Sequence, residues 1–177
     1  MNVKIPDHKF RKALIRLGII FNGYGYTESE KLEKIKQLDL KGLGIKDLTG
    51  IEYFKELSSL SLDDNKLTSI NLSQNLKIDE LEIRDNCLSS LDLGHVEYMH
   101  DISCTDNLLT QIVLPRKGAT HLFASYNNIS DTADLINFDF DNFEYIQLLG
   151  NPGDWWHKLI KDPNKGNYGF PGEWDQE

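Results

Sequence analysis

The chain has 177 residues and a formal net charge of −9, with 28 Asp and Glu against 19 Lys and Arg. This length suits one domain with one continuous core. The acidic balance argues against a nucleic-acid partner, because phosphate contacts require clustered Lys and Arg, and it favours neutral or cationic partners.

The first element that the sequence predicts is a helix beginning near Pro6, a residue suited to the first helical turn. Its apolar residues follow helical spacing: Phe10, Ala13, Leu14 and Leu17. Gly18 can end this helix, and the capping-box sequence Thr27-Glu28-Ser29-Glu30 predicts the start of a second helix. We therefore expect residues 1–35 to form a helix-loop-helix cap.

Residues 36–151 repeat the pattern Leu-x-x-Leu-x-Leu-x-x-Asn. Five copies end in Asn65, Asn86, Asn107, Asn127 and Asn151. These asparagines are 21, 21, 20 and 24 residues apart, within the range of about 20–29 residues for leucine-rich repeats. An earlier unit, which starts at Ile35, has Leu43 in place of Asn. We therefore expect about six units.

Each unit contributes a short strand at its x-Leu-x segment, and its few apolar residues form a core only when neighbouring units stack. The Asn side chains can satisfy backbone groups that a tight coil leaves without partners, so they are predicted to form a ladder. The predicted fold class is an α/β repeat solenoid. It is a curved, right-handed leucine-rich repeat coil with a parallel β-sheet on its concave face, a helical N-terminal cap and a short C-terminal cap.

The opposite, convex side is predicted to be extended or turn-like, because the short period leaves no room for a full helix. The longer last repeat differs, since residues 131–136 can form one or two helical turns. We expect residues 152–177 to form a C-terminal cap and tail, with Trp155 or Trp156 covering the last core.

Cys87 and Cys104 are the only cysteines, and we expect two reduced thiols that pack as small residues. His95 and His100 lack the further ligands of a zinc site. The sequence therefore predicts no metal, no cofactor and no catalytic residues.

The sequence also bears on location. No stretch approaches the about 18 apolar residues that span a bilayer, and the N-terminus lacks the apolar core of a signal peptide. We expect no membrane partner and a cytoplasmic protein. A secreted or cell-surface protein whose signal peptide had been removed would look the same.

Three segments carry a family resemblance: Ile5-Pro6-Asp7-x-x-Phe10-Arg11-x-Ala13-Leu14, Leu38-Asp39-Leu40 and Leu48-Thr49-Gly50-Ile51-Glu52. With the Gly-rich loop between the first two, they resemble the N-terminal cap and first repeat of bacterial internalin-like leucine-rich repeat proteins. The resemblance covers about Ile5 to Asn151. It implies a curved protein-binding scaffold without catalytic residues, often secreted or attached to the cell surface.

In such relatives the cap loop often resembles a calcium site, with acidic residues around a Gly. In this chain Gly25 takes the place of the turn Gly, but Ile20 and Tyr24 stand where oxygen ligands belong. Lys31 stands where a bidentate Glu would be. We therefore expect no calcium in this loop, and an aromatic-packed turn instead.

Residues that alternate with the core positions of each strand point to the concave face. The candidate partner-binding residues on or beside this face are Asp63, Glu80, Glu82, Arg84, Asp101, His121, Phe123, Tyr126 and Tyr145. The acidic surface of an acidic protein explains any single carboxylate among them. Phe123 beside Tyr145 is harder to explain, because exposed aromatic clusters with no core to join tend to mark interaction sites.

We interpret the chain as a non-enzymatic protein-protein interaction module whose concave face binds a basic protein partner. Carboxylates would guide the encounter, and the aromatic residues would hold the complex. Size and acidity suit an inhibitor or immunity-type protein, and we expect a monomer.

Three alternatives stay open. The family resemblance favours a secreted or surface protein for adhesion or host interaction. In a carbohydrate-binding module, Phe123, Tyr126 and Tyr145 would stack on sugars. An enzyme is the least favoured, because an open sheet gives Glu80 and Glu82 no water-excluding pocket to raise a pKa.

Overall fold

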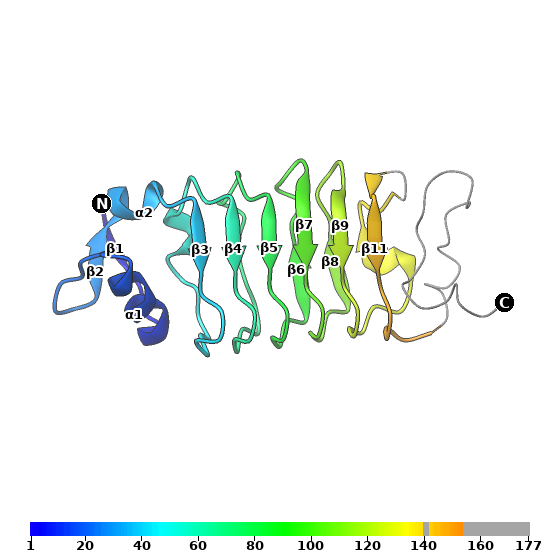
Figure 1. Cartoon of the computed structure of the whole chain (residues 1–177), viewed down its shortest axis with the longest axis horizontal. Helices are drawn as coiled ribbons and strands as arrows, with labels where there is room; N and C mark the ends of the chain where they lie inside the picture. The colour runs from blue at the N-terminus through cyan, green and yellow to red at the C-terminus, as the bar shows by residue number, and fades with distance from the viewer. Residues whose placement is uncertain (140–141, 154–177) are drawn as a thin grey trace.

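The computed structural model describes residues 1–139 and 142–153. The repeats stack side by side along the long axis of the molecule, with the N-terminal cap at one end (Figure 1). Within the described residues, no helix has the length and apolar character needed to cross a membrane. The predicted covering of the last core by Trp155 or Trp156 lies outside the described residues.

Each repeat contributes one strand to a parallel sheet of six strands in the order β11-β9-β7-β5-β4-β3. The strands are β3 (Gln37–Asp39), β4 (Ser59–Ser61), β5 (Glu80–Glu82), β7 (Met99–Ser103), β9 (Ala119–Phe123) and β11 (Tyr145–Gln147). Equivalent repeat positions pair, so Leu60 lies between Leu38 and Leu81. This register confirms the repeat alignment and the solenoid, because a shift by one residue would turn the core side chains outward.

The other side of the coil carries a second parallel sheet of three short strands, in the order β10-β8-β6. These are β6 (Ser90–Asp92), β8 (Gln111–Val113) and β10 (Leu135–Ile136). The short 3₁₀ helices η1 (Ile51–Tyr53) and η2 (Thr132–Asp134) connect elements within the part of the chain that the structure describes. The convex side is therefore extended, as predicted. The helical turns expected for residues 131–136 reduce to η2, because Leu135 and Ile136 pair with β8 instead.

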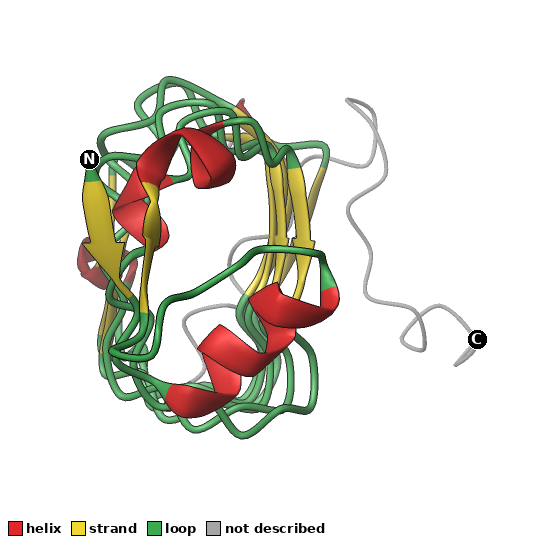
Figure 2. Cartoon of the chain, turned by 90° about the vertical axis from the view of Figure 1, so that its left-hand side faces the viewer, coloured by secondary structure: helices red, strands yellow, loops and turns green. Residues whose placement is uncertain are grey.

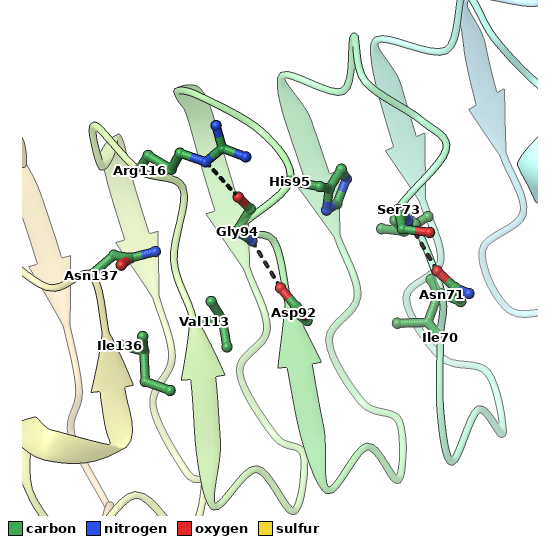
Figure 3. A pocket seen from close by; sticks show the side chains of 11 residues that line it. Ile70, Asn71, Ser73, Asp92, Gly94, His95, Val113, Arg116, Ile136 and Asn137 are labelled. Carbon is green, nitrogen blue, oxygen red and sulfur yellow. Dashed lines mark hydrogen bonds between the residues drawn. The ribbon is translucent and has the colours of Figure 1, made fainter.

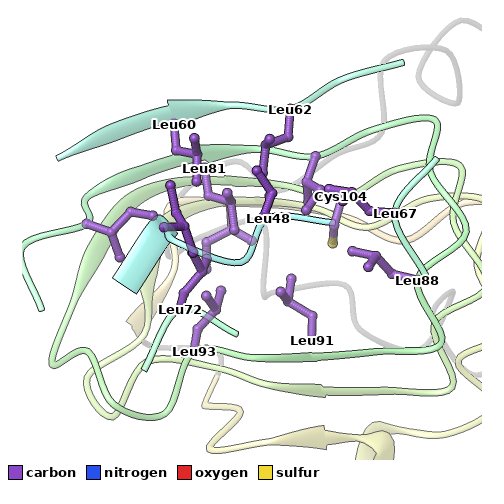
Figure 4. Close-up of a cluster of buried hydrophobic side chains, with 14 of the residues drawn as sticks. Leu48, Leu60, Leu62, Leu67, Leu72, Leu81, Leu88, Leu91, Leu93 and Cys104 are labelled. Carbon is purple, nitrogen blue, oxygen red and sulfur yellow. The ribbon is translucent and has the colours of Figure 1, made fainter. Parts of the chain in front are cut away.

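Leucines from both sides of the coil meet in the core. Figure 4 shows the two groups facing each other: Leu60, Leu62 and Leu81 on one side, Leu91 and Leu93 on the other. Among the described residues, one buried apolar cluster continues from Val3 to Leu148. Cys104 is fully buried within it, and this burial raises the pKa of its thiol to about 12. Cys87 is exposed.

The repeat asparagines form the predicted ladder inside the coil. All five are buried: Asn65, Asn86, Asn107, Asn127 and Asn151. The Oδ1 atom of Asn86 accepts a hydrogen bond from the backbone N–H of Leu67 at 3.0 Å, and its Nδ2 donates to the backbone oxygen of Leu62 at 3.0 Å. Because each amide joins backbone groups of neighbouring turns, the ladder fixes the spacing of the repeats.

The N-terminal cap contains a hairpin that the sequence analysis did not predict. Strand β1 (Asn2–Lys4) pairs antiparallel with β2 (Tyr26–Glu28), and helix α2 (Ser29–Glu33) follows directly. The predicted capping box is wrong, because Thr27 is buried inside β2 and Glu28 occupies the capping position without a side-chain hydrogen bond. Pairing with β1 overrides the local capping pattern.

Helix α1 (His8–Arg16) lies at the N-terminal end of the coil, over one side of its rim (Figure 2). Asp7 caps it, since its carboxylate accepts two backbone hydrogen bonds from the first turn. Gly18 follows its C-terminal end in the left-handed conformation, with φ of 86°. Leu17 does not join the core as predicted. It is 57% exposed, because it occupies the cap position where the chain leaves the helix.

Asn86→Ala is expected to lower the free energy of unfolding by roughly 1–3 kcal/mol, because it leaves the buried N–H of Leu67 without a partner. The carbonyl of Leu62 loses one hydrogen bond but keeps the one from Asn65. Urea unfolding measures this loss. Asn128→Ala is the matched control, since Asn128 is exposed and its loss should change stability by less than about 0.5 kcal/mol. Equal stability of the two variants would mean that the ladder does not support the fold.

Candidate functional site

The parallel register places the outward residues of neighbouring strands in lateral rows on the solvent side of the six-stranded sheet, called the outer face below. The first row is Gln37, Ser59, Glu80, Asp101, His121 and Tyr145. The second row is Asp39, Ser61, Glu82, Ser103, Phe123 and Gln147. The outer face therefore has an acidic centre followed by aromatic residues toward its C-terminal end.

The acidic centre contains two carboxylates on neighbouring strands. Glu80 of β5 stands directly opposite Asp101 of β7, and adjacent strands are about 4.8 Å apart. Like charges in this position repel each other and destabilise a sheet. Asp101 has a partner on its other side, because His121 Nδ1 lies 2.5 Å from Asp101 Oδ1. The carboxylate of Glu80 has no hydrogen bond or ion pair among the described residues.

A shallow hollow of about 340 Å³ lies in the middle of the outer face, where serines are smaller than their neighbours. The residues that line it are Ser59, Leu60, Ser61, Glu80, Glu82, Arg84, Asp101, Ser103 and Phe123. Arg84 Nε donates a hydrogen bond to Ser103 Oγ at 2.5 Å, and its Nη2 lies 3.9 Å from Glu82 Oε1. The hollow thus brings five of the predicted residues together.

Asp63 is not part of the outer face, which corrects the sequence prediction. It is only 3% exposed. Its Oδ1 accepts a hydrogen bond from the backbone N–H of Arg84 at 2.8 Å, and its Oδ2 lies 3.5 Å from Lys41 Nζ. Asp63 comes after the end of β4 at Ser61, where the chain has begun to turn inward. Its carboxylate therefore joins neighbouring turns and is inaccessible to a partner.

The aromatic end of the outer face consists of three rings in contact. The ring centroids of Phe123 and Tyr145 are 5.3 Å apart, with an interplanar angle of 41°, and those of His121 and Phe123 are 6.2 Å apart. Tyr145 is opposite His121 in the register, so it reaches Phe123 diagonally. All three side chains are half-buried. The predicted aromatic pair is present, and His121 connects it to the acidic centre.

Tyr126 lies apart from this cluster, in a column of turn residues that precede the ladder asparagines. The backbone of this column is left-handed, with φ of 56° at Asp64, 52° at Asp85, 54° at Asp106 and 53° at Tyr126. Asp adopts this conformation more readily than most residues with a side chain. Gly150 continues the column with φ of 76°, and a methyl group added there would lie 2.4 Å from the ring of Tyr126.

The aspartates of this column influence one another. The pKa of Asp85 is raised above its ordinary value, first by partial burial and then by the neighbouring carboxylates of Asp106 and Asp64. The charged form of Asp85 is therefore less favourable in the folded protein than in the unfolded chain.

Close to the first row, a hydrogen bond to Asp79 raises the pKa of His100.

Asp85→Asn is expected to stabilise the protein slightly at neutral pH, by roughly 0.5 kcal/mol or less. Asn tolerates the left-handed backbone and removes the repelled charge. Because the folded-state pKa is raised, wild-type Asp85 takes up a proton as the pH falls through that value, and the advantage of Asn disappears in acid. Melting curves at neutral and acidic pH measure this. An equal difference at both pH values would contradict the interpretation.

A larger groove, of about 690 Å³, lies on the convex side of the coil (Figure 3). Three of its polar side chains, those of Asn71, Asp92 and Arg116, already stabilise the turns beneath them. Asp92 accepts a hydrogen bond from the backbone N–H of Gly94 at 2.9 Å, and Asn71 accepts one from the N–H of Ser73 at 3.0 Å. Arg116 Nε donates to the backbone oxygen of Gly94 at 3.1 Å. These groups stabilise the fold, so the outer face is the better candidate site.

The cap loop is organised by Asn22, a residue that the sequence analysis did not single out. Its Oδ1 accepts hydrogen bonds from the backbone N–H groups of Tyr24 and Tyr26, both at 3.0 Å. The aromatic packing expected for this loop is wrong for Tyr24, which is exposed, whereas Phe21 packs against the core. Among the residues that the structure describes, no three His, Cys, Asp or Glu side chains are grouped to hold a metal ion.

The comparisons with known proteins find similarity to solved structures but no match in sequence. No protein-family model and no curated protein sequence matches the chain. The functional domain of InlJ from Listeria monocytogenes, described as including a cysteine ladder, matches with a TM-score of 0.51 and 19% identity over 85% of this chain and 43% of that one. Internalin C2 from Listeria monocytogenes strain 4b F2365 matches with a TM-score of 0.50 and 22% identity over 82% of this chain and 75% of that one.

These likenesses and the repeat geometry define a leucine-rich repeat solenoid. The chain has the fold of the internalins, as the resemblance in its cap and first repeat implied. It spans 43% of the length of the InlJ domain that it matches. At such low identities the likeness extends to the fold alone, so the partner must be argued from the outer face itself.

Proposed function

We propose that this chain is a protein-interaction module whose outer face binds a basic region of a protein partner. The observation that carries the proposal is the register of Glu80 against Asp101, two exposed or half-buried carboxylates on adjacent strands. This arrangement reduces the stability of the free protein. A Lys or Arg side chain of the partner, placed between the two carboxylates, would turn the repulsion into attraction.

The aromatic end of the outer face supplies the second part of such an interface. Phe123 forms one wall of the hollow and contacts Tyr145. Its ring can pack against the methylene groups of a partner side chain or attract its cation. Interfaces concentrate affinity in aromatic anchors of this kind, whereas charges at the rim mainly increase the rate of association. The acidic centre and the aromatic end would thus act on different steps of binding.

A module of this kind acts by covering a surface of its partner, as an inhibitor or immunity-type protein does. We propose no catalytic role for Glu80 and Glu82, because they lie on an open sheet where water screens them. The partner is to be captured with the full chain as bait from extracts of the organism that encodes it. Only proteins lost when the outer face is altered count as partners.

Glu80→Lys combined with Glu82→Lys is expected to slow association with the basic partner at least about tenfold at low ionic strength, because exposed charges act mainly on the encounter. Stopped-flow association rates over a series of salt concentrations measure the effect. Glu56→Lys with Glu97→Lys is the control, since it makes the same change in net charge away from the outer face, at residues in exposed ion pairs. If both double variants slow association equally, the outer face is not the binding surface.

Phe123→Ala and Tyr145→Ala should each lower the free energy of unfolding by about 1 kcal/mol or less, because both rings are only half-buried and lie on the outer face, not in the core. Each should weaken partner binding by about 2 kcal/mol or more, as interface anchors do. Thermal melts and calorimetric titration give the two numbers. Lost stability with unchanged affinity would make the ring pair a structural element of the C-terminal end.

A further inference from the structure

The outward end of the N-terminal cap carries an exposed apolar surface. Helix α1 ends at Arg16, and the chain then turns at Gly18. Ile15 is 52% exposed, Leu17 is 57% exposed and Ile20 is 73% exposed. Ile15 is in the last turn of the helix, Leu17 is in the turn that follows, and Ile20 lies two residues beyond that turn. Exposed aliphatic residues gathered at one place tend to mark a contact surface.

Basic residues border this apolar surface. Residues 1–18 contain five Lys and Arg and one Asp, a net charge of +4, whereas the rest of the chain contains 14 Lys and Arg against 27 Asp and Glu, a net charge of −13. Lys12 and Arg16 are exposed and have no hydrogen bond or ion pair within the described residues. Asp7 forms no ion pair with either residue within the described part of the chain, and its carboxylate accepts hydrogen bonds from backbone N–H groups of α1 and of Lys46.

We propose that this surface, the cap tip formed by Lys12, Ile15, Arg16, Leu17 and Ile20, binds the interface of an anionic lipid bilayer. Aliphatic side chains would enter the boundary between headgroups and acyl chains, and the two cations would contact lipid phosphates. Charge complementarity favours an anionic surface. Projecting aliphatic groups favour lipid over protein, because a bilayer accommodates them without a matching cavity.

The acidic outer face does not prevent this contact. Helix α1 lies at one end of the elongated coil (Figures 1 and 2), and strands β3 and β4 separate the cap from Glu80 on β5. At about 4.8 Å per strand, β5 lies about 10 Å beyond β3. That distance exceeds the Debye length of about 8 Å at physiological ionic strength. The coil would therefore touch the bilayer with its end and keep the outer face accessible, and no membrane-spanning segment is needed.

Vesicle sedimentation with the full chain tests the proposal. The probes are vesicles of phosphatidylcholine with about one-third phosphatidylglycerol, and vesicles of phosphatidylcholine alone. Wild-type protein should sediment with the anionic vesicles only, and less so as salt is added. Leu17→Ser with Ile20→Ser, and Lys12→Glu with Arg16→Glu, should each reduce binding about tenfold or more. Melting temperatures close to wild type show that these variants are folded.

Matched controls separate a local effect from a general one. Leu76→Ser removes an aliphatic side chain that is 66% exposed on another part of the chain, and Lys66→Glu reverses an exposed charge away from the cap. Both should bind anionic vesicles like wild type. The proposal is overturned if the protein ignores anionic vesicles, binds neutral ones equally, or loses binding in the controls as well. It is also overturned if sedimentation velocity without lipid shows self-association that the cap-tip variants abolish, since a second copy would then cover this surface.

Discussion

The structure depends on one constraint, the hydrogen bonding of backbone groups in the tight turns that close each coil. A short repeat has no helix in which those groups pair, so a side chain must supply the partners. The buried asparagines do so by joining each turn to the one before it, as Asn86 joins its own turn to the preceding turn through Leu62 and Leu67. Because every turn closes in the same way, equivalent repeat positions lie directly opposite one another even where the repeats differ in length.

The outer face follows from that register. A residue of one strand meets the equivalent residue of the next, so the composition of a single repeat position becomes a continuous row of side chains. Glu80 therefore meets Asp101, and Asp101 meets His121. The core is satisfied by any aliphatic residue of suitable size, whereas these outward positions contribute little to packing. The rows can change with little effect on the fold, which is why binding specificity is to be sought there.

The sequence predicts the strands, the ladder and most of the outer face because each depends on a repeated local pattern. It fails where a tertiary contact replaces that pattern. Asp63 continues the outward alternation of β4 in the sequence, but the strand ends at Ser61, and beyond that point the alternation no longer applies. Thr27 matches a capping box, but β1 pairs with that segment and draws it into a strand.

The left-handed turn column had a sequence signal that is clear in retrospect. An Asp precedes the ladder asparagine in three successive repeats, at Asp64, Asp85 and Asp106, and Asp is among the residues that best tolerate this backbone. The exposure of Leu17 had no such signal, because helical spacing alone does not show where a helix leaves the core.

The charges of the column and of the first row have a common physical consequence. The column and the first row each place like charges side by side on a surface open to water. Screening by water and salt reduces the repulsion between these charges but does not remove it. In the column, the carboxylates follow from the left-handed backbone, which Asp tolerates. Burial and then the neighbouring carboxylates raise the pKa of Asp85 there. The register of Glu80 against Asp101 has no such backbone origin, because an extended strand accepts almost any residue at that position. A repulsion that the fold does not require is best explained by a partner that binds there. The Asp column follows from the backbone and the pair of Glu80 and Asp101 does not, so the partner is to be sought on the six-stranded sheet.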